Sequence, residues 1–128
     1  MAFLRVFKKQ TFWIFGFFVC ILIGCTSLNT ETKLEDLSAK EIYAKAEKEF
    51  DDGDKVKAAE LFLDIERLYP YSGLAKRALL MSAVALHHEK DYESSRGSAA
   101  RFITFYPADT DTPYAYYLIA LSHYDQID

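Results

Sequence analysis

Apolar and polar positions follow a helical period in the chain after residue 38. Between residues 55 and 69 the apolar side chains recur at steps of three and four, so they share one face of a helix. Only five Gly and three Pro occur among 128 residues, which disfavours a turn-rich β fold. Together with capping signals and a repeated pattern, this predicts an all-α protein with five helices, at about residues 39–52, 55–69, 73–89, 92–106 and 113–124.

Residues with capping preferences mark the ends of the predicted helices. Ser38 and Glu41 are spaced as a capping box, in which the Ser and Glu side chains each pair with a free backbone N–H. Structure is therefore expected to begin at Ser38. Gly53 suits the left-handed position that closes a helix. Thr112 and Pro113 suit the N-cap and the first position of the last helix.

The helical pattern recurs with a period of 37 residues. The triplet Leu-Tyr-Pro at 68–70 returns as Phe-Tyr-Pro at 105–107. A period of this size is the sequence signature of a helical repeat array, in which each helix pair stacks on its neighbours because it cannot bury its apolar face alone. Small residues are expected where paired helices cross closely, namely at Ala46, Ala58, Ala83 and Ser95.

The repeat resembles the tetratricopeptide (TPR) repeat, whose unit is 34 residues. Residues 53–70 carry the turn, small, aromatic and proline positions of its second half, while Lys45 and Glu49 stand where its first half expects apolar residues. Three additional residues before the first helix of the second repeat account for the longer period. The resemblance implies a right-handed α-solenoid of about two and a half TPR-like helical hairpins, at residues 38–70, 73–107 and, incompletely, 112–128.

The only strongly apolar run lies at the start of the chain. Residues 11–24 are uncharged and nearly all apolar, and they follow a segment with three basic residues, Arg5, Lys8 and Lys9. A membrane-spanning helix needs about 20 apolar residues, so this shorter run has the geometry of a signal peptide. An uncleaved signal-anchor is the alternative, because the uncharged run continues through Leu28.

The apolar run ends in a motif that resembles the lipobox of bacterial lipoproteins, namely Leu22, Ile23, Gly24 and Cys25. The resemblance implies removal of residues 1–24, a diacylglyceryl group on the Cys25 thiol and an acyl group on the new amino terminus. Two or more acyl chains give stable membrane anchoring. The residue after the cysteine is Thr26. In such lipoproteins a residue other than Asp at this position indicates sorting to the outer membrane. Residues 25–37 are then the lipidated cysteine and a flexible tether.

Charge and side-chain chemistry argue against several functions. Of the 15 basic residues three precede Cys25, and none of the 19 acidic residues does, so the chain from Cys25 onward has a formal charge of −7. This balance disfavours nucleic-acid binding, which needs basic residues at the phosphates. His87 and His88 are adjacent and point about 100° apart on a helix, so they are not expected to share a metal ion. Asp109 and Asp111 suit a turn. The sequence predicts neither an enzyme nor a metal or cofactor site.

The remaining candidate is a binding surface. In TPR arrays the first helix of each pair lines a concave groove that binds extended peptides or partner helices. Tyrosine is a favoured contact residue because it buries area with few rotatable bonds and keeps a polar tip. The alternative for each aromatic residue is packing against a neighbouring helix. By repeat position, the residues expected to face the groove are Tyr43, Glu47, Phe50, Arg77, Leu80, Val84, His87, Tyr114, Tyr117, Leu121 and Tyr124.

Three segments resemble those of the BamD family of lipoproteins, namely LYPYS at 68–72, AARFITFYP at 99–107 and PYAYYLIAL at 113–121. Members of this family belong to the outer-membrane β-barrel assembly (BAM) complex. The family folds as five TPR repeats, so the resemblance implies an N-terminal fragment. It further implies a non-enzymatic scaffold at the periplasmic face of the outer membrane. Such a scaffold binds unfolded outer-membrane proteins and barrel-assembly subunits (BamA-like). The alternative function is a TPR scaffold of another envelope complex, lipid-anchored or signal-anchored.

Overall fold

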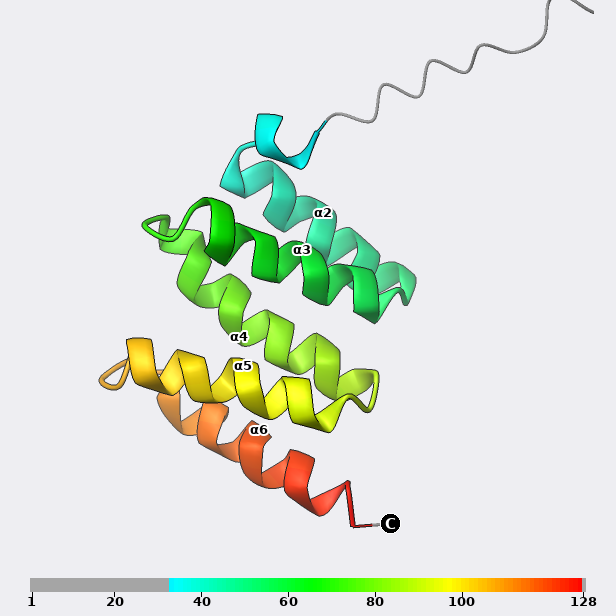
Figure 1. The fold of residues 1–128 in the computed structure, drawn as a ribbon, viewed down its shortest axis with the longest axis vertical. Coiled ribbons are helices and arrows are strands. Elements are labelled where there is room, and N and C mark those ends of the chain that lie inside the picture. Colours follow the sequence, from blue (N-terminus) through cyan, green and yellow to red (C-terminus); the bar gives the residue numbers. More distant parts are fainter. Residues whose placement is uncertain (1–32, 128) are drawn as a thin grey trace, which may run out of the picture. The chain divides into compact units, whose positions relative to one another are not determined.

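The computed structural model describes residues 33–127, which form one short 3-10 helix and five α-helices, without a β-strand in this range (Figure 1). All five predicted helices are confirmed, and each predicted end lies within one residue of the observed end. The predicted signal peptide, the lipobox and Cys25 lie outside the described residues. The elements are η1 (Leu34–Asp36), α2 (Ala39–Asp52), α3 (Lys55–Leu68), α4 (Gly73–His88), α5 (Tyr92–Phe105) and α6 (Thr112–Tyr124).

Successive helices pack side by side as stacked hairpins (Figure 1). Each helix contacts the next one along the chain, and α4 also contacts both α2 and α6. The first helices of the hairpins, α2, α4 and α6, therefore form a row of neighbours. This arrangement confirms the predicted all-α, TPR-like repeat architecture.

The predicted capping signals shape the first hairpin. The Ser38 hydroxyl accepts a hydrogen bond from the Glu41 backbone N–H at 3.3 Å, and the Glu41 carboxylate accepts one from the Ser38 N–H at 2.8 Å. The capping box is therefore confirmed. Gly53 follows α2 with φ of +98°, a left-handed conformation that glycine adopts without a steric penalty. Asp54 then caps α3 by accepting from the Lys57 N–H.

The array begins earlier in the chain than expected. Residues 34–36, predicted to belong to the flexible tether, form the 3-10 helix η1. Leu34 and Leu37 pack against the first core cluster, and the Tyr69 hydroxyl donates a hydrogen bond to the Leu37 carbonyl oxygen. The two leucines thus bury apolar surface in the core. The sequence pattern did not predict this, because polar residues surround both leucines in the chain.

The start of α6 differs by one residue from the prediction. Asp111 is its N-cap, Thr112 its first residue and Pro113 its second. The Thr112 hydroxyl instead donates a 2.7 Å hydrogen bond to the Tyr106 carbonyl oxygen. The prediction of Thr112 as the N-cap is therefore wrong, because its hydroxyl is hydrogen-bonded to a carbonyl oxygen at the end of the preceding helix.

The core consists of two clusters that meet along α4. The first lies between α2, α3 and α4 and includes Ile42 and Phe62, and the second lies between α4, α5 and α6 and includes Leu79 and Phe102. All four side chains are fully buried. The small residues predicted at the helix crossings are also fully buried, which confirms the prediction for Ala46, Ala58, Ala83 and Ser95.

Candidate functional site

The row of helices α2, α4 and α6 carries every residue predicted to line a groove. Three of these residues occupy the same repeat position, 37 residues apart: Tyr43, Leu80 and Tyr117. Tyr43 and Leu80 are only 6% and 8% exposed, whereas Tyr117 is 55% exposed. The available part of the predicted surface is therefore concentrated on α6.

The expected groove exposure is wrong for Tyr43. Its ring packs edge-on against Phe62, with 5.3 Å between the ring centroids, and the Arg77 guanidinium lies 5.6 Å from the ring on the side of α4. Burial raises the pKa of the Tyr43 hydroxyl above its usual range. The next helix of the row thus covers the tyrosine and leaves the exposed Arg77 side chain at the surface.

The expected exposure is also wrong for Leu80, for the same reason. Leu80 belongs to the second core cluster together with Ala115 and Leu118 of α6. Val84, one turn further along α4, is half-buried against this cluster, and Leu121 of α6 is half-buried as well. Packing of α6 on α4 therefore consumes most of the apolar surface that α4 was predicted to offer a partner.

Phe50 ties α2 to both of its neighbours. Its ring is half-buried and meets the His88 ring edge-on, with 5.6 Å between the centroids. The Lys55 ammonium lies 3.7 Å from the Phe50 ring centroid and donates a hydrogen bond to the Phe50 carbonyl oxygen. Close stacking of a cation on an aromatic face stabilises the pair. Phe50 and His88 therefore act as packing residues at this end of the array.

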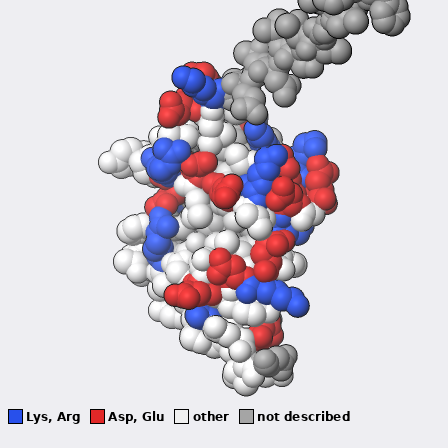
Figure 2. All heavy atoms as spheres, turned by 45° about the vertical axis from the view of Figure 1, so that its right-hand side comes forward, with Lys and Arg blue, Asp and Glu red and all other residues white. Residues whose placement is uncertain are grey.

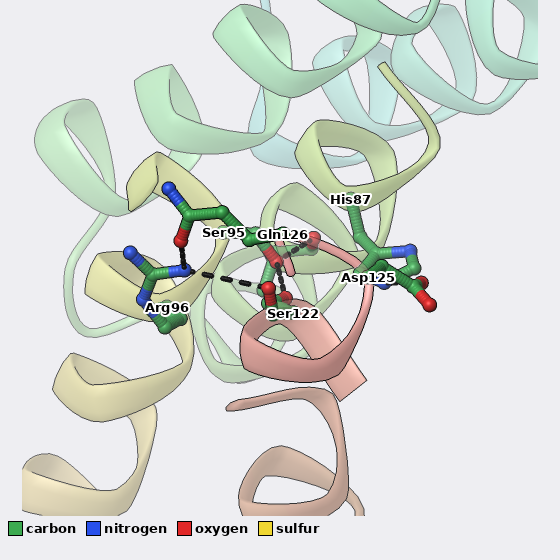
Figure 3. A network of polar contacts seen from close by, with 7 residues as sticks. His87, Ser95, Arg96, Ser122, Asp125 and Gln126 are labelled. Atoms are coloured by element: carbon green, nitrogen blue, oxygen red, sulfur yellow. Dashed lines mark hydrogen bonds and ion pairs between the residues drawn. The ribbon is translucent and has the colours of Figure 1, made fainter. Parts of the chain in front are cut away.

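His87 helps to fasten the end of α6 to the array (Figure 3). Its Nε2 lies 3.1 Å from the Asp125 carboxylate, and its ring packs edge-on against Tyr92 of α5. The Nε2 contact lacks hydrogen-bond geometry, so the attraction depends on protonation of His87. On the other side of α6, Arg96 donates a 2.7 Å hydrogen bond to the Gln126 side chain.

Within residues 33–127, no three His, Cys, Asp or Glu side chains are grouped to hold a metal ion.

Three tyrosines on one face of α6 form the most exposed part of the predicted groove. At about 100° per residue, Tyr114, Tyr117 and Tyr124 fall within one arc of the helix. Their exposed fractions are 44%, 55% and 74%, and the rings of Tyr114 and Tyr117 stack with 6.1 Å between centroids. We call these three residues the α6 tyrosine surface. Glu47 of α2 and Arg77 of α4 are the other predicted groove residues that are exposed.

A second exposed face of α6 was not predicted. Tyr116 is 58% exposed, although Ile42 and Leu79 at the same repeat position are fully buried. Ala120 is exposed too, whereas its counterparts Ala46 and Ala83 are fully buried. In the first two hairpins the following helix covers this face, and no helix follows α6 within the described residues. The 37-residue register itself was the signal that could have identified Tyr116.

Charged side chains of both signs are mixed over the face shown in Figure 2. Across the described residues, charged side chains form ion pairs between or within helices, among them Lys57 with Glu49 at 2.8 Å and Arg67 with Asp64 at 2.7 Å. Because the charges alternate, this face carries no extended field of one sign that would attract a polyanion. No helix within residues 33–127 is both long enough and apolar enough to cross a bilayer.

Comparisons with known proteins agree with this architecture. A family model described as YfiO, outer membrane lipoprotein, matches residues 35–128. The outer membrane protein assembly factor BamD of Caulobacter vibrioides is 32% identical over 106 residues, which are 81% of this chain and 35% of that protein. BamD of Rickettsia prowazekii is 41% identical over 68 residues, or 53% of this chain and 27% of that protein. BamD of Neisseria gonorrhoeae is 26% identical over 104 residues, or 78% and 39%. The chain thus spans about a third of the length of these curated relatives.

Proposed function

This chain belongs to the YfiO family of outer membrane lipoproteins, and we propose that it acts as a lipid-anchored TPR scaffold of the outer-membrane β-barrel assembly machinery. Lipid on Cys25 holds the array at the periplasmic face of the outer membrane. The array binds unfolded outer-membrane proteins and barrel-assembly subunits. Support comes from the family match and from relatives named as outer membrane protein assembly factors.

The observation that carries the binding part of the proposal is the stacked pair Tyr114 and Tyr117. Both rings are about half exposed, and their mutual stacking limits their freedom before any partner binds. A preordered aromatic pair loses little conformational entropy on binding, and its hydroxyls can still bond to a backbone. An extended strand of an unfolded β-barrel protein presents apolar side chains on one face and unpaired backbone groups along its edges, and the tyrosine pair can contact both.

The mechanism is holding without chemical change. A segment of unfolded chain lies along the α6 tyrosine surface, while the exposed Arg77 and Glu47 provide polar contacts on α4 and α2. Ordering an unfolded segment costs free energy, so the affinity is modest and release to the insertion subunit remains easy. No covalent step, metal or organic cofactor takes part, and the only bound groups are the diacylglyceryl and acyl chains on Cys25.

Binding of a urea-unfolded β-barrel protein to the detergent-solubilised chain tests this surface. Tyr117→Ala should weaken binding by about tenfold, because removing one central aromatic contact costs about 1–2 kcal/mol. Tyr71→Ala is the matched control, since Tyr71 is a fully exposed tyrosine outside α6. Equal affinity of the Tyr117→Ala and Tyr71→Ala variants would refute the proposed role of the α6 tyrosine surface.

Two measurements on envelope extracts test the anchor and the assembly. The mass of the cell-derived protein should correspond to a chain that starts at a triacylated Cys25, whereas retention of residues 1–24 would indicate the signal-anchor alternative. A pull-down with the lipidated chain should recover barrel-assembly subunits. Recovery of a different envelope complex in their place would assign the chain to another scaffold.

A further inference from the structure

Two exposed aromatic side chains project from the same end of the array. Tyr71, in the loop between α3 and α4, is fully exposed, and Phe105, the last residue of α5, is 56% exposed. Both lie where a second helix ends and the next first helix begins. The connections from α3 to α4 and from α5 to α6 are on the left-hand side of Figure 1. We call Tyr71 and Phe105 the loop aromatics. Single exposed aromatic side chains are common on protein surfaces, so exposure alone does not mark a contact surface. What distinguishes these two is that they lie at the end of the array where the chain enters it.

Residues 34–37, where the described chain enters the array, are held close to the loop that carries Tyr71. The Tyr69 hydroxyl donates a hydrogen bond to the Leu37 carbonyl oxygen, and Leu34 packs on the same core cluster as Leu68 and Tyr69. The chain therefore joins the array next to the loop that carries Tyr71. The position of this junction is a property of the folded array.

Chain length then places this end of the array close to whatever holds Cys25. Nine residue steps separate Cys25 from Leu34, and a fully extended chain spans at most about 3.4 Å per residue, or about 30 Å in all. The helices have 13 to 16 residues, so the opposite end of the array lies about 20 Å further away. If a bilayer holds the lipid on Cys25, the loop aromatics can therefore lie closer to that bilayer than the opposite end of the array can.

We propose that the loop aromatics contact the lipid bilayer and orient the array with this end toward the membrane. This inference rests on the lipid anchor of the proposed function. Tyrosine is enriched at membrane interfaces because its ring suits the acyl boundary and its hydroxyl the headgroups. Four of the nearby charges are neutralised in pairs, since Arg67 pairs with Asp64 and Lys76 pairs with Asp109.

A bilayer suits Tyr71 better than a protein partner does. Energetically dominant residues of protein interfaces sit in packed pockets surrounded by other contacts. Tyr71 is fully exposed, so no neighbouring side chain of the array would help to enclose it against a protein partner. Insertion into a bilayer interface does not require such neighbouring side chains. The lipid anchor also keeps the loop at a high local concentration near the surface, so a weak contact is sufficient to set the orientation.

The chain offers a direct spectroscopic test, because its only tryptophan is Trp13. Trp13 lies in the signal peptide that the proposed lipidation removes, so in the lipidated protein Tyr71→Trp places a single reporter at the loop. A Trp13→Phe background keeps this true for any uncleaved chain. Val56→Trp is the matched control, since Val56 is 52% exposed and lies near the start of α3, at the opposite end of the array. The lipidated full chain is reconstituted on vesicles of phosphatidylethanolamine and phosphatidylglycerol with or without brominated acyl chains.

In the Tyr71→Trp protein, brominated lipid should quench the fluorescence about twofold and the emission should shift to shorter wavelength, as for a residue at the membrane interface. The Val56→Trp protein should show neither change. If both proteins float with the vesicles and neither is quenched, the anchor stands and the orientation is refuted. If neither protein floats with the vesicles, the lipid anchor fails, and the orientation fails with it.

Discussion

The Ser95 hydroxyl donates a 2.8 Å hydrogen bond to the Ala83 carbonyl oxygen, at the crossing of α5 and α4. Both residues are fully buried. Their counterparts in the first hairpin, 37 residues earlier, are Ala58 and Ala46. A serine can therefore replace an alanine at this crossing, because the neighbouring helix supplies an acceptor for its hydroxyl.

Removal of this hydroxyl should destabilise the second hairpin. Ser95→Ala deletes the bond to Ala83 and leaves the buried Ser122 hydroxyl without its 3.4 Å contact to Ser95. We expect a loss of about 1–2 kcal/mol in the free energy of unfolding, measured with urea. Ser94→Ala on the exposed side of the same helix is the control and should change it by less than about 0.5 kcal/mol. Equal effects of the two variants would contradict the assigned role of the hydroxyl.

Two phenylalanines of α5 should differ strongly in their contribution to stability. Phe102 is fully buried in the second core cluster, whereas Phe105, one turn later, is 56% exposed. Phe102→Ala should cost about 3–5 kcal/mol because it removes apolar contacts and leaves a cavity. Phe105→Ala should cost less than about 1 kcal/mol. Urea denaturation of both variants tests this difference, and a large loss in Phe105→Ala would show that its ring packs in solution.

The ion pair between Lys76 and Asp109 should make stability depend on pH at both extremes. The hydrogen bond from Lys76 lowers the pKa of the Asp109 carboxyl, and the same bond raises the pKa of the Lys76 ammonium. The lowered carboxyl pKa stabilises the fold above the unfolded-state value, and this contribution is lost as the pH falls through the folded-state pKa. The raised ammonium pKa stabilises the fold below its unfolded-state value and is lost as the pH rises through the folded-state pKa. The pair therefore contributes between about pH 4 and pH 10.

Asp109→Asn tests the acidic side of this window. The variant should have a lower urea midpoint than the wild type at pH 7, and the difference should shrink as the pH falls below about 4. The amide oxygen can still accept the hydrogen bond that Asp109 takes from the Asp111 N–H, so the change removes only the carboxylate charge and the bond from Lys76. Asp51→Asn, at an exposed position of α2, is the control. A midpoint difference that stays constant from pH 7 to pH 3 would rule out this linkage.

Tyr69 should control the segment that leads into the array. Tyr69→Phe removes the hydroxyl that bonds to the Leu37 carbonyl oxygen but keeps the ring in the core. One neutral hydrogen bond contributes about 1 kcal/mol, so amide exchange at Asp36 and Leu37 should accelerate about fivefold. Hydrogen-exchange mass spectrometry of peptides covering these residues measures the change. Tyr71→Phe serves as the control, and equal exchange in both variants would contradict the proposed attachment.

The helices and their closest crossings could be predicted because they depend on local order in the sequence. The capping box at Ser38, the left-handed Gly53 and the small residues at the crossings all act within one hairpin, and the structure confirms them. The 3-10 helix at residues 34–36 was missed because Leu34 and Leu37 are isolated among polar residues. Their burial depends on Tyr69, which lies more than 30 residues later in the chain.

The predicted binding surface depended on information that the sequence does not carry locally. Tyr43, Leu80 and Tyr117 occupy one repeat position, yet Arg77 and Phe62 cover Tyr43, α6 covers Leu80, and Tyr117 is exposed. By itself, the sequence determined the helices, the 37-residue register and the side of each helix on which these residues lie. Only the tertiary structure decided which of them remain available to a partner, because the exposure of a repeat position depends on the neighbouring helix that packs over it.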